Sequence, residues 1–318
     1  MMPAGPRGFE ARLRAGRFVI TAEISPPVSS DPEHLLARAM PLAHLADAVN
    51  ITDSASANVH LSALAAAAIL VQHGIEPVLQ FTCRDRNRIA LQGDLLGAAA
   101  LGIRNLLLLT GDNPGAGDQP NAKPVFDLDS RALIETTVGI RDRSELPSGR
   151  TVAGRADFFI GVADVPLDPP AGWSPVSLQN KIAAGAQFVQ TQFCMDGGIA
   201  RRYLRRLAEE GITERVFVLI GVVPLASARS ALWIRDHLPG ALIPGPIIDR
   251  LGRSADPKRE GKRICIELMR ELAEVPGVRG VHLMAPRNHA ALAEVIAEAR
   301  SGSDPGSADQ SAPRKPLV

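Results

Sequence analysis

The feature that most constrains the fold is an alternation of short apolar runs with longer helical segments along nearly the whole chain. Eight runs are rich in strand-forming residues: RFVITAEIS, ADAVNIT, EPVLQFTC, NLLLLTGD, FFIGVADV, FVQTQF, VFVLIGVV and VRGVHLM. Several are continuously apolar rather than alternating, which is typical of strands that are buried on both faces. The pattern therefore indicates a parallel sheet covered by helices.

Helical segments with recognisable ends separate these runs. In DPEHLLARAMPLAHL, Asp31 fits an N-cap, Pro32 fits the first turn, and Pro41 is expected to kink or end the helix. Eight strands, each followed by a helix, predict a (β/α)8 TIM barrel, with PKREGKRICIELMRELAEVPG as an extra helix before the last strand. The alternative is an open doubly wound sheet.

The chain length of 318 residues suits one large barrel or two modest domains. We predict that residues 1–300 form a single barrel domain. The last stretch, SGSDPGSADQSAPRKPLV, has too few apolar residues to pack a core, so residues 301–318 are predicted to be a disordered tail. The Gly/Pro-rich segment 113–128 is predicted to be a long loop after the fourth strand, and it is either functional or a tolerated insertion.

Composition argues against several classes of function. A net charge of +1 gives no broad positive field for nucleic acid or anionic lipid, and 4% aromatic residues leave few rings for base stacking. No run is long enough to span a bilayer and the N-terminus lacks the apolar core of a signal peptide, so a cytoplasmic protein without a membrane partner is expected. Neither the three cysteines nor the seven histidines show a metal-binding spacing. Whether the chain forms a homo-oligomer is left open.

Polar residues at the ends of the predicted strands are the candidates for chemistry, because active sites of such barrels lie where strands end and loops begin. They are Glu23, Asn50, Thr52, Asp53, Gln80, Thr82, Thr110, Gly111, Asp112, Asp164, Thr191, Gln192, Asp196, His282, Arg287 and Asn288. No GxGxxG, P-loop or GxSxG motif occurs. A nucleotide cofactor would therefore have to bind in the mouth of the barrel.

Two of these residues, Glu23 and Asp112, are candidate catalytic carboxylates. Glu23 has apolar sequence neighbours, so burial is expected to raise its pKa and keep it protonated, as a proton donor requires. Asp112 follows LLLLTG and is expected at a turn whose N–H groups keep it ionised. Each could instead be a paired or capping carboxylate.

Basic residues near the strand ends allow two interpretations. The cluster of Arg84, Arg86 and Arg88 could bind phosphate or a carboxylate-rich ligand, although a solvated face is the favoured interpretation. Lys181 lies inside a predicted helix, where a surface lysine is the simplest interpretation.

Four segments at the strand ends, AEISPP, LLLLTGDNP, KIAAGAQFVQTQFCMD and GVVPL, resemble segments of the methylenetetrahydrofolate reductase family in matching order. The loop GDQPNAKPVFDLDS also resembles one found in that family, and the likeness extends over residues 17–290. The resemblance implies a (β/α)8 barrel that binds FAD. It also implies an enzyme that passes hydride from NAD(P)H to 5,10-methylenetetrahydrofolate, giving 5-methyltetrahydrofolate.

The resemblance also implies roles for single residues. Glu23 would be the general acid that protonates the pterin nitrogen, so that the folate ring opens to an iminium cation. Asp112 would lie near the pterin and the flavin, Gln192 would hydrogen-bond the pterin, and Arg287, with Asn288 as the competing position, would lie near the p-aminobenzoyl-glutamate. Residues that would line the flavin site are Thr52, Gln80, Thr110, Gly111, Asp112, Phe126 and Lys181.

The sequence departs from the family pattern at several flavin contacts. Thr110 and Asn180 stand where the family has arginine, Ser174 stands where an acid is expected, and GVADVPLDPP lacks the usual Tyr and His. The alternatives are a flavin-independent or deazaflavin-dependent pterin reductase, an enzyme whose electrons come from a partner subunit, and a catalytically silent pterin-binding paralogue. Retention of Glu23, Asp112 and Gln192 favours an enzyme.

Overall fold

The eight predicted strands are present, and each pairs in parallel with its neighbours in the sequence. In the computed structural model, which describes residues 8–286 and 288–301, β8 also pairs with β1, so the sheet closes into a barrel. The prediction of a TIM barrel is confirmed, and the alternative of an open sheet is wrong. The strands are β1 (Val19–Ile24), β2 (Ala48–Ile51), β3 (Pro77–Thr82), β4 (Asn105–Leu109), β5 (Phe159–Asp164), β6 (Phe188–Phe193), β7 (Phe217–Val222) and β8 (Val278–Met284).

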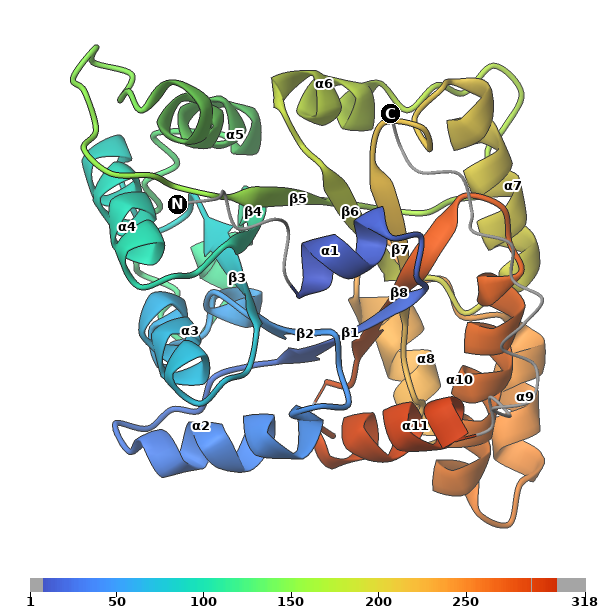
Figure 1. Ribbon diagram of the computed structural model, residues 1–318. Helices are drawn as coiled ribbons and strands as arrows, with labels where there is room; N and C mark the ends of the chain where they lie inside the picture. The colour runs from blue at the N-terminus through green and yellow to red at the C-terminus, as the bar shows by residue number, and fades with distance from the viewer. Residues whose placement is uncertain (1–7, 287, 302–318) are drawn as a thin grey trace.

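Helices surround the barrel, as Figure 1 shows in a view roughly down its axis. Asp31 caps the first of them as predicted, because its side chain accepts a hydrogen bond from the backbone N–H of Glu33 at 3.0 Å. The surrounding helices are α2 (Pro32–Ala39), α3 (Ala63–Gln72), α4 (Arg88–Ala100), α5 (Ser130–Val138), α6 (Val176–Ala184), α7 (Gly197–Glu209), α8 (Ala228–His237), α9 (Gly245–Arg253), α10 (Pro257–Ala273) and α11 (Ala290–Ser301).

The extra helix predicted before the last strand is α10, and the described part of the chain contains three further α-helices that the sequence pattern did not reveal. They are α1 (Phe9–Arg14), α5 and α9. Each is short, and α9 begins with Gly-Pro and contains a second glycine, a composition that resembles a loop. In α5, two threonines and a valine weaken the helical signal after the long loop.

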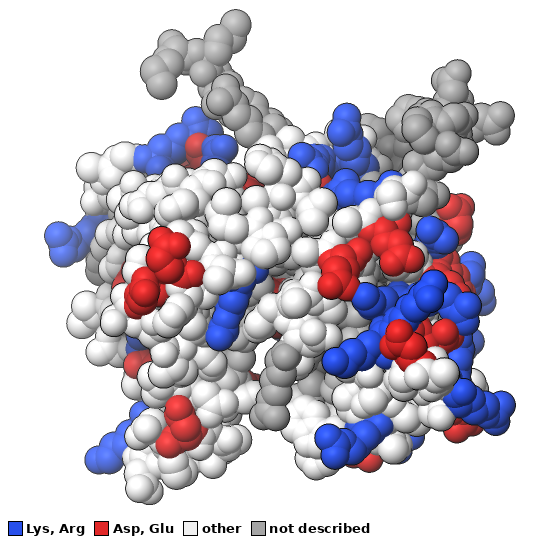
Figure 2. All heavy atoms as spheres, turned by 90° about the horizontal axis from the view of Figure 1, so that it is seen from below, with Lys and Arg blue, Asp and Glu red and all other residues white. Residues whose placement is uncertain are grey.

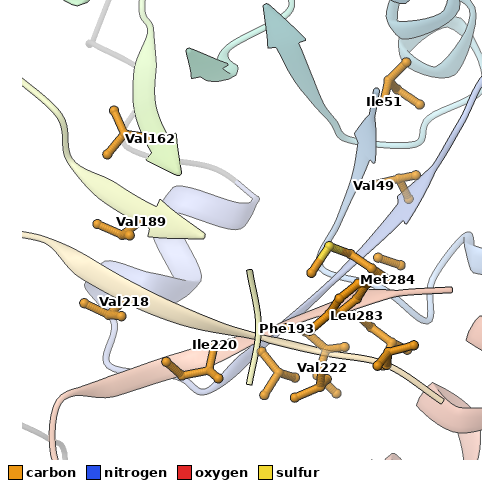
Figure 3. Packing of buried hydrophobic residues seen from close by; sticks show 14 of the residues in the cluster. Val49, Ile51, Val162, Val189, Phe193, Val218, Ile220, Val222, Leu283 and Met284 are labelled. Atoms are coloured by element: carbon orange, nitrogen blue, oxygen red, sulfur yellow. The ribbon is translucent and has the colours of Figure 1, made fainter. Parts of the chain in front are cut away.

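The outward side chains of the strands pack against the helices in the larger hydrophobic core. Figure 3 shows part of it, with Val162, Val189 and Val218 placed alike on three successive strands. These alternate positions face the helices, so the positions between them face the barrel lumen.

The lower half of the lumen, at the amino ends of the strands, is filled by a separate apolar cluster. We call it the lower lumen cluster, and it consists of Phe9, Leu13, Val19, Ala48, Val78, Leu107, Phe159, Phe188, Phe217 and Leu219. The rings of Phe159 and Phe188 stack with centroids 4.8 Å apart, and Phe9 meets Phe188 edge-on at 5.3 Å. Gly161 makes room for this packing, because a Cβ there would lie 2.2 Å from the Phe188 ring.

Helix α1 closes the lower end of the lumen, and in Figure 1 it lies across the middle of the barrel. It contributes Phe9 and Leu13 to the lower lumen cluster. Glu76, just before β3, fixes its start, since both carboxylate oxygens accept from the Phe9 N–H at 3.0 Å. Because this end is plugged, any ligand of the lumen has to enter at the carboxyl ends of the strands.

Charges of both signs interleave on the outside of the helices. Figure 2 shows this on the side where α9 and α10 lie, and there Arg250 pairs with both Glu260 and Glu267. In residues 8–286 and 288–301, no helix is both long and apolar enough to cross a membrane. The predicted disordered tail, residues 301–318, lies outside the described residues except for Ser301, which ends α11. The predicted domain boundary at residue 300 stays a prediction.

Candidate active site at the carboxyl end of the barrel

The inward-facing positions of the strands change from apolar to polar halfway up the lumen. Above the lower lumen cluster lie four fully buried polar side chains, which we call the lumen network: Thr21, Asn50, Gln190 and His282. Asn50 Nδ2 donates to Gln190 Oε1 at 2.6 Å, and Gln190 Nε2 donates to Thr21 Oγ1 at 2.9 Å. Since β2 and β6 lie on opposite sides of the barrel, the first of these bonds crosses the lumen.

Glu23 lies directly above the lumen network, one inward position further along β1 than Thr21. Gln80 Nε2 donates to Glu23 Oε2 at 2.5 Å, and His282 Nε2 lies 3.4 Å from the same oxygen. The Glu23 side chain is 23% exposed, so it is open to the mouth rather than enclosed as predicted. The predicted residues Glu23 and Gln80 are thus in direct contact, in a position where a ligand in the mouth could reach the carboxyl group.

Asp112 lies at the end of β4 and is exposed, with one oxygen accepting from the Ser56 N–H at 3.0 Å. The predicted backbone donor is therefore present, although it comes from the loop after β2 instead of Asp112's own turn. That loop is strained, because Ser54, Ser56 and Ala57 have φ angles of 52°, 54° and 56°. Strain of this kind next to an exposed carboxylate is a common mark of a functional site.

The residues next to Asp112 show why the turn after β4 contains glycine. Gly111 has a φ of 98°, and a Cβ there would come within 3.0 Å of Thr82 and Arg84. Thr110 is exposed, as is Phe126, whose side chain is 38% exposed on a backbone with φ 41°. Both predicted flavin contacts are accessible from solvent.

Thr52, at the carboxyl end of β2, has a side-chain hydroxyl group that makes no hydrogen bond within the described residues. The oxygen of this hydroxyl group is buried. Buried polar atoms are nearly always satisfied, and an exception often marks a place for a ligand or water. Thr52 therefore fits its predicted place in a binding site.

Lys181 is not the surface lysine that its sequence position suggested. Its Nζ donates to the Ala163 carbonyl oxygen at 2.7 Å, at the end of β5 and close to Asp164. Burial lowers the pKa of Lys181, with the charge of Asp164 acting in the opposite direction. Burial also raises the pKa of Asp164, which accepts a hydrogen bond from the Tyr203 hydroxyl. The four groups form a compact polar unit beside the mouth.

The arginines of the basic cluster after β3 pair with acids, and only Arg88 among them is largely exposed. Arg84 is 2% exposed and pairs with Asp85, while Arg86 pairs with Asp53 and Asp94. Arg88, at the start of α4, is 59% exposed and pairs with Asp127 in the following loop. The favoured interpretation of a solvated face is wrong for Arg84, and it holds only in part for the other two.

Of the two predicted substrate contacts, Gln192 lies two strands away from β4, the strand that precedes Asp112. Gln192, on β6, is half-buried, and its Nε2 lies 3.4 Å from the Pro239 carbonyl oxygen, while its Oε1 accepts from the Phe193 N–H. Arg287 lies outside the described residues. Asn288, the competing position, is half-buried in the segment that leads to α11.

The long loop 113–128 lies against the neighbouring loops of the mouth. The Asp118 carboxylate accepts from the Val59 N–H at 3.1 Å, and the Val125 N–H donates to the Arg84 carbonyl oxygen at 2.8 Å. A Cβ at Gly117 would come within 1.9 Å of the Ala57 carbonyl oxygen, so the two loops touch. The loop thus forms part of the wall beside Asp112, which favours the functional interpretation over a tolerated insertion.

The residues assigned to a flavin run along an arc from β2 to α6, and they fit FAD only in part. The unsatisfied Thr52 hydroxyl and the exposed Phe126 ring suit contacts with a planar ring system. The phosphates of FAD require cations or clustered N–H donors. Lys181 already donates to Ala163 beside Asp164, and Arg84 and Arg86 are paired with acids. The phosphate end is therefore the poorly fitting part.

Sequence reasoning missed the lumen network. Asn50 and His282 were noted as strand-end residues without a role, and Thr21 and Gln190 were not singled out. A signal was present, because Thr21 and Glu23, like Gln190 and Gln192, are polar residues at alternate positions of otherwise apolar strands. Two polar side chains on the same face of a buried strand indicate that this face lines a polar interior.

These contacts define a closed parallel barrel with a partly exposed carboxyl group between an amide and an imidazole at its open end. The comparison with known families makes this specific. The chain belongs to the methylenetetrahydrofolate reductase family, whose model matches residues 8–300.

Two curated relatives carry that name. The chain is 27% identical over 239 residues to a probable methylenetetrahydrofolate reductase (NADPH) from Caenorhabditis elegans, a match that covers 73% of this chain and 33% of the relative. It is 25% identical over 234 residues to methylenetetrahydrofolate reductase 1 of Schizosaccharomyces pombe, covering 70% and 35%. The chain thus spans about a third of the length of these relatives.

Among solved structures, the chain is similar to an uncharacterized protein from Clostridium thermocellum that is described as binding two copies of 5-methyl-5,6,7,8-tetrahydrofolic acid. The TM-score is 0.65 at 12% identity, and the match covers 92% of this chain and 99% of the other. At this identity the likeness shows the barrel fold, and the bound folate is a property of the other protein.

Proposed function

We propose that this chain is a reductase that transfers hydride from NAD(P)H to 5,10-methylenetetrahydrofolate and so gives 5-methyltetrahydrofolate. Membership of the methylenetetrahydrofolate reductase family supports the substrate class, and so does the folate bound by the structurally similar Clostridium thermocellum protein. The observation that carries the proposal is the position of Glu23. It is a carboxyl group on the inner face of the barrel, between Gln80 and His282, and partly open to the mouth.

The chemistry explains why an acid is needed there. In 5,10-methylenetetrahydrofolate one carbon bridges two nitrogens. When Glu23 gives its proton to one nitrogen, the bond from that nitrogen to the bridging carbon breaks and an iminium cation forms at the other. Hydride from the reduced nicotinamide then adds to the bridging carbon, which becomes the methyl group. Solvent reaches the partly exposed Glu23 and returns the proton.

The remaining predicted residues have matching tasks in this proposal. The exposed carboxylate of Asp112, held by the Ser56 N–H, would stabilise the cation by its negative charge. Gln192 would hydrogen-bond the edge of the pterin, and Arg287 would meet the p-aminobenzoyl-glutamate. A cytoplasmic location also stays a prediction.

The route of the hydride has two candidates. If FAD is bound, Thr52, Gln80, Thr110, Gly111, Asp112, Phe126 and Lys181 would hold it, and it would relay hydride between nicotinamide and folate. The second candidate is direct transfer from the nicotinamide without a flavin. It is favoured by the commitment of Lys181, Arg84 and Arg86 to partners within the protein. A deazaflavin donor and a partner subunit that supplies electrons are further variants of the same reaction.

An activity assay with a spectrum of the purified protein tests the proposal. The protein is mixed with 5,10-methylenetetrahydrofolate and NADH or NADPH, and formation of 5-methyltetrahydrofolate is followed by chromatography. Absorbance bands of oxidised flavin in the preparation support the FAD route, while product formed by a colourless protein supports direct transfer.

Product formation with either nicotinamide supports the proposed function. Folate binding without product, even when reduced flavin or reduced deazaflavin is supplied, would contradict it and favour the catalytically silent paralogue. The control is the same assay without protein, because reduced folates oxidise in air.

A further inference from the structure

We propose that His282 is a positioning residue that determines which oxygen of Glu23 carries the acidic proton. The inference rests on the proposed function, in which Glu23 is the proton donor. It depends on the lumen network beneath Glu23, whose polar atoms fix the protonation of the imidazole ring.

The Nδ1 atom of His282 faces the other residues of the lumen network. It lies 2.9 Å from Thr21 Oγ1 and 3.3 Å from Gln190 Nε2. An amide nitrogen can only donate, and the Thr21 hydroxyl, which already accepts from Gln190 Nε2, has a proton of its own to give. The two hydrogens of Gln190 Nε2 point to Asn50 Oδ1 and Thr21 Oγ1, so the hydrogen for Nδ1 comes from the Thr21 hydroxyl. The other acceptor near that hydroxyl, the Val281 carbonyl oxygen, is more distant at 3.4 Å. Nδ1 is therefore assigned as the acceptor of the Thr21 hydroxyl, and the ring hydrogen is assigned to Nε2.

The amide orientation of Gln190 is coupled to that of Asn50. Its Oε1 accepts from Asn50 Nδ2 at 2.6 Å, while its Nε2 donates to Asn50 Oδ1 at 3.1 Å. Turning only the Gln190 amide would set two acceptors and two donors against each other in a site from which water is excluded, and this is costly. In this arrangement the donor side of Gln190 faces Thr21 and His282.

The upper nitrogen of His282 then has its hydrogen directed at Glu23. Nε2 lies 3.4 Å from Glu23 Oε2, the same oxygen that accepts from Gln80 Nε2 at 2.5 Å. The His282 contact is long, as hydrogen bonds of catalytic groups often are before substrate binds. Two N–H groups converge on Oε2, so a proton on that oxygen would face two other hydrogens.

The acidic proton of Glu23 is consequently placed on Oε1. Within residues 8–286 and 288–301, no hydrogen bond involves Oε1, so this oxygen is available to a ligand in the mouth. The two N–H groups on Oε2 also stabilise the carboxylate that remains after the proton has left. His282 therefore acts on the reaction through Glu23, by orienting the acid and by holding its conjugate base.

Other ionisable groups around Glu23 differ from His282 in their position. His289, just before α11, is close enough to interact with Glu23, and burial together with the nearby charge of Arg38 lowers its pKa. Arg38 itself donates to the Ser25 carbonyl oxygen. His289 lies in the segment before α11 and Arg38 lies in α2, whereas His282 lies on β8 and contacts Glu23 from below.

Two variants of His282 distinguish the effect of its hydrogen bond to Glu23 from the effect of the space that its ring fills. His282→Gln can place its side-chain NH2 where the Nε2–H of His282 lies, while His282→Met fills similar volume without a donor. We expect His282→Met to lower kcat about ten- to a hundredfold with little change in KM for the folate, since one hydrogen bond to a charged group is lost. The pH at which kcat falls by half should move upward by about one unit. His282→Gln should recover most of both properties.

Equal losses of kcat in the two variants with an unchanged pH profile would overturn the proposal, and so would full activity of His282→Met. Thermal unfolding of both proteins shows that each is folded before it is assayed.

An NMR measurement of the His282 tautomer tests the proposal without relying on enzyme activity. In the ¹⁵N NMR spectrum of the wild-type protein labelled at histidine, the His282 signals should show a proton on Nε2 and none on Nδ1. A proton on Nδ1 would overturn the proposal even if folate is reduced. If the NMR result is as expected while wild-type protein makes no product, the proposed function fails and the assigned tautomer stands.

Discussion

The lower and upper halves of the barrel lumen share the same strand walls but differ completely in chemistry. The lower half is a dry cluster of aromatic and aliphatic side chains, closed from below by α1. The upper half holds Thr21, Asn50, Gln190 and His282, joined by hydrogen bonds and overlaid by Glu23. The change takes only two residues along a strand, as from Phe188 to Gln190.

The lower half of the lumen supports the upper half mechanically. A densely packed lower half excludes water and fixes the strands, and this gives the upper half rigid walls. Polar groups of the upper half can then be buried at low cost because nearly all of them are paired. We therefore expect stability to depend mainly on the lower half and chemistry mainly on the upper half, and three substitutions test this division.

The largest effect is expected for Glu23→Gln in the upper half. The amide keeps the size of the side chain but cannot donate the acidic proton, so turnover should fall about 10²- to 10⁴-fold. Folate binding, measured by calorimetry, should be retained, and the free energy of unfolding should change by no more than about 1 kcal/mol. The matched control is Glu214→Gln, the same chemical change at an exposed site before β7, which should leave turnover unaltered.

The next effect is expected for Phe188→Ala in the lower half. Removing a fully buried ring leaves a cavity beside Phe9 and Phe159, and the free energy of unfolding should fall by about 3–5 kcal/mol. Chemical denaturation measures the loss. Phe126→Ala, at an exposed site on the loop wall, is the control and should change stability by less than about 1 kcal/mol. Similar losses for the two variants would show that the lower half is not the main source of stability.

The smallest effect is expected for Glu76→Gln, which alters the link between α1 and the barrel. Burial raises the pKa of Glu76, so the folded protein binds its proton more tightly than the unfolded chain does. The stability contributed by the protonated form is present at low pH and is lost as pH rises through the folded-state pKa. An amide cannot titrate, so the variant should become more stable relative to the wild type as pH rises.

The size of that change is expected to stay within about 1 kcal/mol, because the amide oxygen can still accept from Phe9 N–H and Asn105. Denaturation curves from acidic to neutral pH measure the difference between the two proteins. A difference that falls with pH would show that ionised Glu76 stabilises the attachment of α1.

Much of the fold could be predicted because the strands are long apolar runs with clear ends. FVQTQF and VRGVHLM match β6 and β8 residue for residue. Closure of the sheet followed from the number of strand–helix units. The short helices α1, α5 and α9 were missed because their residues lack a strong periodic signal, and packing on the barrel stabilises them instead.

The site was predictable only to the level of single strand ends. Glu23 and Gln80 were both singled out, but their contact depends on the position of β1 relative to β3 in the closed barrel. The bond from Asn50 to Gln190 joins residues 140 positions apart across the lumen, and no local pattern encodes it. The pairing of Lys181 with Ala163 likewise depends on how α6 packs beside β5.

The central claim is that proton donation belongs to the upper half of the lumen and is separable from the packing below it. The most direct measurement determines turnover and free energy of unfolding on the same preparations of Glu23→Gln and Phe188→Ala. The expected result is that Glu23→Gln loses turnover but keeps its stability, whereas folded Phe188→Ala loses stability but keeps its turnover. Wild-type turnover in Glu23→Gln would contradict the claim.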